Sequence, residues 1–351
     1  MLSATDCSYQ FIIVSPPALT SLLSGDTFCR MAKVNTALGA ISADQMGPTL
    51  MHEHMVIGYP GWDLETGESH FDLHELAGIV AGKLGEVRNY GVQTVVDATP
   101  DDLGRNMELN KMIANETGLN IICSTGKYMD SGAMSLQITS RSVSLDMTNR
   151  LHDTFVKEIT AGIHDSGIRA GVIKVATSEG HIFPYEEIVL KAAASAQKET
   201  GAPIITHTQE GTMGPEQALL LLSEGADPGK IAIGHMCGNS DIQYQLAVLN
   251  QGVTVNFDRW GLDIIYPDEL RKATLLELLK RGFEDKVVVS HDHIAHWLIR
   301  QPDMPDFARP LIANWSYTHI FRNIIPYLKT AGVTDDQINT IMIENPKRLF
   351  E

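Results

Sequence analysis

Two histidines near the start of the chain have a spacing that suits a divalent metal ion. Residues 49–55 read TLMHEHM, which predicts a β-strand. Side chains alternate between the two faces of a strand, so Leu50, His52 and His54 are expected to share one face. Zinc and related metals need at least three protein ligands, so the two histidines require further ligands elsewhere in the chain.

From residue 33 onward, short β-branched runs alternate with longer segments of helical periodicity. The predicted strands are Thr49–His54, Gln93–Thr99, Asn120–Thr125, Gly171–Ala176, Pro203–His207, Lys230–His235, Val253–Phe257 and Lys286–Asp292. Predicted helices include Leu73–Tyr90, Tyr185–Thr200, Pro215–Glu224, Asp241–Gln251 and Asp268–Arg281. This alternation implies a parallel sheet, and eight such units predict an α/β fold, a single-domain (β/α)₈ TIM barrel. A doubly wound open sheet is disfavoured because no Gly-x-Gly-x-x-Gly motif follows the first strand.

In such a barrel, chemistry is expected at the C-terminal ends of the strands, on side chains that face the interior. Four polar residues, Lys174, His207, His235 and Asp292, lie at or near these ends. Alternation places each one on a face with apolar neighbours. The sets are Val172 with Lys174, Ile205 with His207, Ile231 and Ile233 with His235, and Val288 with Asp292, where the polar Ser290 lies between the last two. Each residue alone has a structural interpretation, but together with the first two histidines they predict one shared site.

Lys174 has the most informative surroundings of these residues. A charged lysine in the apolar segment Gly171–Ala176 would be costly, and burial lowers the pKa of its amine. One interpretation is an ion pair with a neighbouring carboxylate. The other is that the neutral amine takes up carbon dioxide and becomes a carbamate, an anionic ligand that can bridge two cations.

Composition excludes several classes of function. The chain has 351 residues, is 44% hydrophobic and carries a formal charge of -16, which argues against nucleic-acid binding. No run of about 18 apolar residues exists, so no membrane-spanning helix is expected. Four cysteines without C-x-x-C spacing indicate neither a disulfide framework nor a thiolate zinc site, and a cytoplasmic location with reduced thiols is expected.

Residues 1–32 are predicted to be an N-terminal extension outside the fold, with Met31 as an alternative start, and residues 33–351 to form the barrel. The extension contains a mildly apolar stretch, Phe11 to Leu23, preceded by Asp6 and by no basic residue. A cleaved secretion signal is the alternative, although such signals have a basic start and an unbroken apolar core.

The ordered set His52-Glu53-His54, Lys174, His207, His235 and Asp292 resembles the phosphotriesterase family of the amidohydrolase superfamily, over about residues 33–351. Further matching segments are Asn35-Thr36, Gly47–Leu50, Thr125–Tyr128, Asp227–Lys230, Ser290–Asp292 and Glu344–Phe350. Residues 257–263 (FDRWGLD) and the short segment from Asp292 to Trp315 are most similar to the phosphotriesterase-like lactonases. Trp260 departs from the tyrosine usual in those enzymes.

The resemblance implies two divalent metal ions bridged by N6-carboxylated Lys174 and by a hydroxide. One ion would be held by His52, His54, Lys174 and Asp292, and the other by Lys174, His207 and His235. Zinc is expected, with iron, cobalt or manganese as alternatives, because histidine and carboxylate ligands accept them all. The resemblance also implies a homodimer, for which Trp62 is a candidate contact.

The expected activity is hydrolysis of lactones, such as acyl-homoserine or other γ- and δ-lactones, with weak phosphotriesterase activity as a side reaction. The resemblance makes Asp292 the proton acceptor, and Tyr128 either a substrate contact or a wall of the pocket. Arg259 would contact the substrate, orient its loop, or pair with Asp258 or Asp263. A dedicated organophosphate triesterase or another carboxylic ester hydrolase is the alternative. A binding protein without activity is disfavoured because no ligand is missing.

Secondary predictions concern residues around the site. His293 and His296 are expected to line the pocket or to face solvent rather than to bind metal. By alternation His291 points away from the barrel axis, and Cys237 is expected to be a small buried filler. His181 and Glu210 lie in loops beyond metal-bearing strands and are candidates for the pocket wall.

Overall fold

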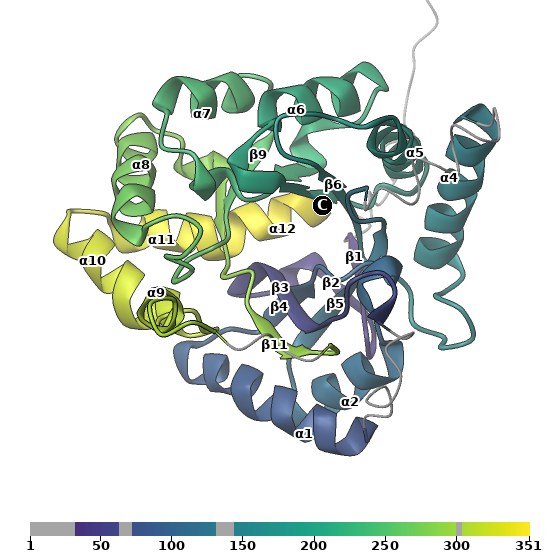
Figure 1. Ribbon diagram of the computed structural model, residues 1–351, viewed down its shortest axis with the longest axis horizontal. Helices are drawn as coiled ribbons and strands as arrows, with labels where there is room; N and C mark the ends of the chain where they lie inside the picture. The colour runs from purple at the N-terminus through teal and green to yellow at the C-terminus, as the bar shows by residue number, and fades with distance from the viewer. Residues whose placement is uncertain (1–31, 63–71, 131–143, 300–303) are drawn as a thin grey trace, which may run out of the picture. The chain divides into compact units, whose positions relative to one another are not determined.

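In the parts of the chain that the computed structural model describes, residues 32–62, 72–130, 144–299 and 304–351, nine parallel strands form the main sheet (Figure 1). Their order is β10-β9-β8-β7-β6-β5-β4-β3-β11. The bounds are β3 Thr49–Ile57, β4 Thr94–Asp97, β5 Asn120–Gly126, β6 Val172–Thr177, β7 Ile204–Thr208, β8 Ile231–Ile233, β9 Thr254–Phe257, β10 Val287–Val289 and β11 Ile294–Trp297. The predicted extension, apart from its last residue, lies outside the described residues.

The sheet closes on itself through a break in the eighth barrel strand. β10 pairs with β9, and β11, which follows β10 after four residues, pairs with β3. Within the break, the Asp292 amide donates to the His52 carbonyl at 3.0 Å, and the His54 amide donates to the His293 carbonyl at 3.0 Å. β10 and β11 together therefore act as one interrupted strand, and the predicted (β/α)₈ barrel is confirmed.

Helices follow the strands and surround the ring (Figure 1). Those between strands are α1 Leu73–Leu84, α2 Met107–Thr117, α4 Ser144–Thr160, α5 Pro184–Thr200, α6 Gly214–Ser223, α7 Ile242–Leu249 and α8 Asp268–Lys280. Several begin at an N-cap whose side chain accepts from a first-turn amide, namely Asp72, Asn106 and Asp241. None of the helices in the described ranges is long and apolar enough to cross a membrane.

The remaining elements flank the barrel. A hairpin of β1 (Lys33–Thr36) and β2 (Gly39–Ser42) precedes it. The chain ends in short helices, α9 Arg309–Ile312, α10 Ile325–Thr330, α11 Asp335–Asn339 and α12 Asn345–Phe350. Figure 1 shows the end of α12, marked C, near the centre of the ring.

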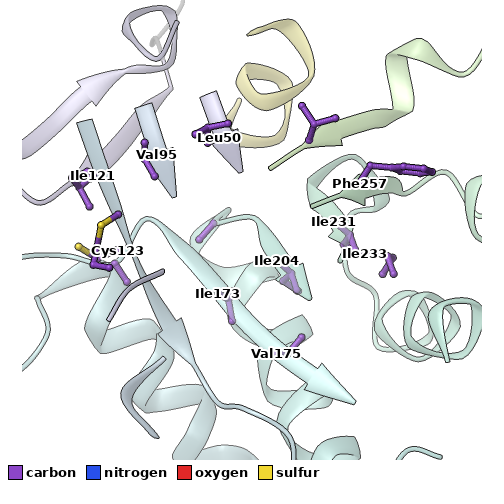
Figure 2. Close-up of a cluster of buried hydrophobic side chains, with 14 of the residues drawn as sticks. Leu50, Val95, Ile121, Cys123, Ile173, Val175, Ile204, Ile231, Ile233 and Phe257 are labelled. Atoms are coloured by element: carbon purple, nitrogen blue, oxygen red, sulfur yellow. The ribbon is translucent and has the colours of Figure 1, made fainter. Parts of the chain in front are cut away.

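Alternate strand residues face the helices and form an outer apolar cluster. Figure 2 shows members of this cluster from successive strands, Leu50, Val95, Ile121, Cys123, Ile173, Val175, Ile204, Ile231, Ile233 and Phe257. Most are β-branched, as expected for strands packed on both faces. Burial of such side chains is the main favourable contribution to the stability of the ring.

The other face of the strands fills the barrel interior below the site. This inner cluster contains Met51, Val96, Ile122, Val172, Ile205, Ala232 and Val288 from the strands, and Leu349 and Phe350 from α12. The apolar C-terminal residues therefore pack against the interior of the barrel. The polar site described below continues the same inward face toward the C-terminal ends of the strands.

The predicted alternation is confirmed in β6 and β7, where Val172 and Ile205 belong to the inner cluster. It is wrong in β3, because Leu50 belongs to the outer cluster while His52 faces the interior. The reason is a register shift, in which Leu50 pairs with Val95 but Glu53 pairs with Asp97, so that β3 has one more residue than β4 over this stretch. The added residue reverses which side chains point inward.

The prediction is also wrong in β8, where Ile231 and Ile233 lie in the outer cluster and only Ala232 points inward. His235 reaches the interior because its backbone adopts a left-handed conformation, with φ of 56°. Asp292 has a similar φ of 52°, so two of the predicted site residues are placed by a local turn and not by strand periodicity.

Candidate metal centre and active site

The six residues predicted as metal ligands lie together at the C-terminal ends of the strands. His52 Nε2 is 2.6 Å from Lys174 Nζ and 3.4 Å from Asp292 Oδ1. The same Asp292 oxygen lies 3.1 Å from His54 Nε2. The geometry therefore brings four of these residues, from β3, β6 and the broken eighth strand, to one point.

The other two residues adjoin this group. His207 Nδ1 lies 2.8 Å from His235 Nε2. The same His235 nitrogen lies 3.7 Å from Asp292 Oδ2. One donor atom each from His52, His235 and Asp292 falls within 4.8 Å of the others, a grouping that can hold a metal ion. Asp292 thus touches both parts of the cluster.

The ring nitrogen of each histidine that points away from the cluster has its own partner. The pairs are His54 Nδ1 with Thr99 Oγ1 at 2.8 Å, His207 Nε2 with Gln209 Oε1 at 2.7 Å, His235 Nδ1 with Asp258 Oδ1 at 2.8 Å, and His52 Nδ1 with Asp258 Oδ2 at 2.9 Å. Such partners fix the orientation of a metal-binding imidazole and raise its basicity. The remaining nitrogens are left facing the centre of the cluster.

Burial favours the neutral form of three of these imidazoles, those of His52, His207 and His235. It lowers the pKa of His52 to about 3, with the charge of Lys174 acting in the same direction, and it lowers the pKa of His207 and of His235. Burial opposes ionisation of Asp292 as well, but nearby His235, His52 and Arg259 hold the pKa of its carboxyl well below the usual range. Neutral imidazoles and an ionised carboxylate are the forms that bind a metal.

Lys174 is 1% exposed, and burial lowers the pKa of its amine to about 8. Among the ion pairs of the described residues, none joins Lys174 to a carboxylate, so the ion-pair interpretation from the sequence has no support. Its nearest polar neighbour is the His52 ring nitrogen. A buried amine that is easily deprotonated, beside imidazole donors and a carboxylate, fits a site for divalent cations.

A cavity of about 240 Å³ opens above this cluster. Its polar floor is formed by His54, Tyr128, Lys174, His207, Arg259 and Asp292. Its walls are largely apolar and include Ile57, Tyr59, Leu103, Leu262, Ile264, Ile265, Ile294, Trp297, Met304, Ile312 and Trp315. A few convergent polar groups under an apolar wall are typical of a site for a small organic substrate.

Tyr128 and Arg259 both line the floor. The Tyr128 ring packs edge-on against His207 with centroids 5.0 Å apart, and its backbone amide donates to the Asp102 carboxylate at 3.0 Å. Arg259 Nε donates to Asp292 Oδ2 at 3.0 Å. The structure therefore pairs Arg259 with Asp292, and not with Asp258 or Asp263, which was one of the alternatives considered from the sequence.

The residues given secondary roles lie away from the cluster. Trp260 is fully buried in the outer apolar cluster and does not line the cavity. His181 and Glu210 are exposed and do not line it either. His293 packs edge-on against Trp315 and Tyr317, with centroids 4.9 and 4.5 Å apart. None of these four residues is therefore positioned as a ligand.

Two structural predictions are confirmed, and one surface prediction is revised. His291 is fully buried and contacts Glu53 instead of the cavity, and Cys237 is a buried member of the outer cluster. Trp62 is half-buried and packs against the core, so its ring is less available for a subunit contact than the sequence suggested.

Sequence reasoning missed the partners of the histidines, Thr99, Gln209 and Asp258. Asp258 is fully buried and directly follows β9. The rule that placed the ligands, a polar residue at the C-terminal end of a barrel strand, applies equally to Asp258. Thr99 and Gln209 follow β4 and β7 at similar positions, but nothing in their residue type separates them from ordinary loop residues.

Known proteins share this architecture. A solved structure described as an organophosphorus hydrolase from Deinococcus radiodurans has 42% identity and a TM-score of 0.88, and the match covers 92% of this chain and 97% of the other. A mutant of a PTE-like lactonase from the same organism has 41% identity and a TM-score of 0.87, with 91% and 100% covered. A "Phosphotriesterase homology protein" from Mycobacterium tuberculosis is 37% identical, covering 92% of this chain and 98% of the relative.

The sequence profile of the Phosphotriesterase family matches residues 32–350, which is nearly the whole region that forms the barrel. The proteins similar to this chain include an organophosphorus hydrolase and an aryldialkylphosphatase, and the site combines donors for a divalent metal with a cavity for a small substrate. The chain is therefore a metal-dependent hydrolase that acts on ester bonds, and it belongs to the phosphotriesterase family.

Proposed function

We propose that this protein opens lactones that carry an apolar substituent, through a binuclear metal site, and hydrolyses phosphotriesters as a side reaction. The observation that carries the proposal is the shape of the cavity. Its polar floor leaves room for a small ring, while Trp297, Ile294 and Met304 are among the apolar residues that offer a wall for an attached chain. The PTE-like lactonase of Deinococcus radiodurans supports the choice of lactone.

The residues available for the metals are the four histidines, Lys174 and Asp292. We propose zinc at both positions and N6-carboxylation of Lys174, which supplies a bridging anion. Two divalent cations, when bound, lower the pKa of a shared water and polarise the carbonyl oxygen of the substrate. The neutral imidazoles and the ionised Asp292 described above support this assignment.

The chain's own residues would then carry the proton and orient the substrate. Asp292 takes up the proton of the attacking water on a carboxylate oxygen, and Arg259 holds that carboxylate through Oδ2. The oxygen of water joins the carbonyl carbon, the ring C–O bond breaks, and the proton passes to the leaving alkoxide. Tyr128, beside His207, lies where it can orient the ring carbonyl.

Hydrolysis of phosphotriesters as the main activity is the second candidate, because the Deinococcus radiodurans structure is also described as an organophosphorus hydrolase. The same polar floor would accept a phosphoryl oxygen in place of a carbonyl. The homodimer implied by the sequence resemblance also remains a proposal, and light scattering on the full chain tests it.

A paired rate assay separates the two activities. Metal-loaded protein prepared with bicarbonate is offered γ- and δ-lactones, including acyl-homoserine lactones, and in parallel paraoxon. The proposal predicts that kcat/KM for at least one lactone exceeds that for paraoxon, and that Asp292→Asn loses both activities. Paraoxon turnover ahead of every lactone would assign the protein to the triesterases instead.

A further inference from the structure

The break in the eighth barrel strand places Asp292 in a conformation that few residues adopt. Its φ of 52° lies in the left-handed region, where a side chain other than glycine is disfavoured. The strand stops at Val289 and pairing resumes at Ile294, so Asp292 sits in a four-residue interruption. Something outside Asp292 must hold this segment in place.

Glu53 holds the interruption on both sides of Asp292 without contacting it. Its Oε1 accepts from the Ser290 hydroxyl at 2.8 Å, the His291 amide at 2.9 Å and His291 Nδ1 at 2.7 Å. Its Oε2 accepts from the His293 amide at 2.9 Å. Glu53 is fully buried and does not line the cavity, whereas its two neighbours, His52 and His54, belong to the donor cluster.

Each of these four groups is a donor toward Glu53. His291 Nε2 accepts from the Ile320 amide at 3.1 Å, so Nδ1 of the neutral ring carries the hydrogen and donates. The Ser290 hydroxyl oxygen accepts from the His52 amide at 2.9 Å, which leaves its own hydrogen for Glu53. Burial raises the pKa of the Glu53 carboxyl to about 8, and the hydrogen bonds from His293, Ser290 and His291 act in the opposite direction. Because all four neighbouring groups donate, a carboxylate satisfies each of them, whereas an amide would direct an N–H group at one of them.

We propose that Glu53 is the positioning residue for Asp292. Its carboxylate binds the backbone and side chains on both sides of Asp292 and so holds the strand break in the conformation that points Asp292 into the site. This inference rests on the proposed function in one respect, the assignment of Asp292 as a metal ligand. The competing explanation is that Glu53 only stabilises the fold, as any buried and fully bonded carboxylate would.

Glu186 provides a matched control. It is also fully buried, and it accepts from the Ser178 hydroxyl at 2.6 Å and from the amides of Ser178, Asp130 and Phe183. It lies outside the cavity lining and has no part in the donor cluster. Glu186→Gln therefore removes an equivalent carboxylate without changing the setting of Asp292.

The experiment measures Co²⁺ affinity by chelator competition on full-length, metal-stripped protein in bicarbonate buffer, with urea unfolding of the metal-free variants alongside. Glu53→Gln is expected to weaken Co²⁺ binding about 10- to 100-fold. Glu186→Gln is expected to lose a similar amount of unfolding free energy, while its Co²⁺ affinity stays within about threefold of the wild-type value. Equal weakening in both variants, or none in Glu53→Gln, would overturn the inference. If Glu53→Gln fails to fold, Glu53→Asp keeps the charge, shortens its reach and is judged by the same criterion.

A double-mutant cycle tests whether the effect passes through Asp292. In an Asp292→Asn background, adding Glu53→Gln should weaken Co²⁺ binding by less than about threefold, because the positioned ligand is already lost. If Glu53→Gln weakened Co²⁺ binding as strongly in the Asp292→Asn protein as in the wild type, that result would contradict the inference. A crystal structure of metal-free Glu53→Gln supplies a readout that needs no metal. The 3.1 Å contact between His54 Nε2 and Asp292 Oδ1 should be broken in that variant. An intact contact would contradict the proposal.

These readouts separate the two claims. Absence of lactone turnover by the wild-type protein would refute the proposed substrate and leave the Co²⁺ and crystallographic results for Glu53 standing. Unchanged affinity and an unchanged Asp292 contact in Glu53→Gln would refute the positioning role while leaving the lactonase proposal intact.

Discussion

Asp258 Oδ1 accepts two hydrogen bonds from His235, one from the backbone amide at 2.9 Å and one from ring Nδ1 at 2.8 Å. The pair of bonds fixes both the left-handed backbone of His235 and the direction of its ring. The other oxygen of Asp258 lies 2.9 Å from His52 Nδ1, so a single carboxylate orients histidines from β3 and from the end of β8. Asp258 therefore links the two parts of the donor cluster.

Replacing Asp258 with asparagine should disturb both histidines at once. The amide directs an N–H group at one ring nitrogen, and we expect metal affinity and kcat to fall about 10- to 100-fold. Asp241→Asn is the control, since asparagine also serves as a helix N-cap and Asp241 caps α7. Metal titration and steady-state kinetics of both variants check the prediction, and an Asp258→Asn enzyme with wild-type affinity would contradict it.

Gly126 allows the end of β5 to pass close to Lys174. A Cβ built there would lie 1.8 Å from the Lys174 carbonyl oxygen, at a φ of 122°. Gly39 has a similar φ of 119° and no heavy atom within 4 Å of a Cβ, so Gly39→Ala measures the backbone strain alone, about 1–3 kcal/mol. Gly126→Ala should destabilise the protein by at least about 1–3 kcal/mol more. Equal urea midpoints and equal m-values for the two variants would show that the close approach has no cost.

Arg105 and Glu158 form a buried bidentate pair, with Nη1 to Oε2 at 2.7 Å and Nη2 to Oε1 at 2.9 Å. Arg105 also donates to the Ser124 carbonyl at 2.8 Å, which ties α4 to β5. Glu158→Gln leaves the guanidinium without a charged partner and should lower the free energy of unfolding by about 3 kcal/mol. Chemical denaturation at pH 7 measures this loss.

The effect of Glu158 should depend on pH in a defined direction. Burial opposes ionisation of Glu158, but hydrogen bonds and charge from Arg105 hold the pKa of its carboxyl below the usual value. The contribution is therefore complete above the unfolded pKa, near pH 4.3, and is lost as the pH falls through the lower folded value. The stability gap between wild type and Glu158→Gln should narrow below about pH 4. If the difference in unfolding free energy between wild type and Glu158→Gln grew as the pH fell, the pKa of Glu158 would be raised in the folded protein and not lowered.

Trp297 offers a test of the apolar wall. It lines the cavity and lies beside Tyr59, with ring centroids 5.8 Å apart. Trp297→Ala should lower kcat/KM for a long-chain acyl lactone about 10-fold or more, because apolar contact area is lost, and should affect a short-chain lactone much less. The short-chain substrate is the internal control. An equal loss of kcat/KM for both substrates would contradict a role in binding the acyl chain and would show instead that Trp297 acts on the reacting groups or on folding.

Sequence alone predicted the barrel and the convergence of the six predicted ligand residues at one end of it, for reasons that differ from strand to strand. In β6 the uninterrupted alternation of Val172, Lys174 and Ala176 made the prediction secure. In β3 and after β8 the final positions were right while the argument was wrong, because a register shift and a left-handed His235 each reversed the inward face. Periodicity cannot detect either feature, since both depend on contacts with neighbouring strands.

The carboxylate partners were the part that sequence could not supply. The pairing of Arg259 with Asp292, and of Asp258 with two histidines, depends on which side chains meet across the barrel mouth. Both aspartates follow a strand, so the sequence gives them the same expected location. Asp292 contacts the ring nitrogen of His54 that faces the cluster, whereas Asp258 contacts the Nδ1 atoms of His235 and His52, and only the folded structure shows this difference.

Reconstitution of the metal-free chain tests the central claim most directly. Zinc is added stepwise with bicarbonate, and both bound zinc per chain and lactone hydrolysis are followed in wild type and in Lys174→Ala. The account predicts that activity rises until two zinc ions are bound, that omitting bicarbonate lowers it, and that Lys174→Ala binds fewer ions and loses turnover. Undiminished lactone hydrolysis by Lys174→Ala would contradict the bridging role of Lys174 and the binuclear site built on it.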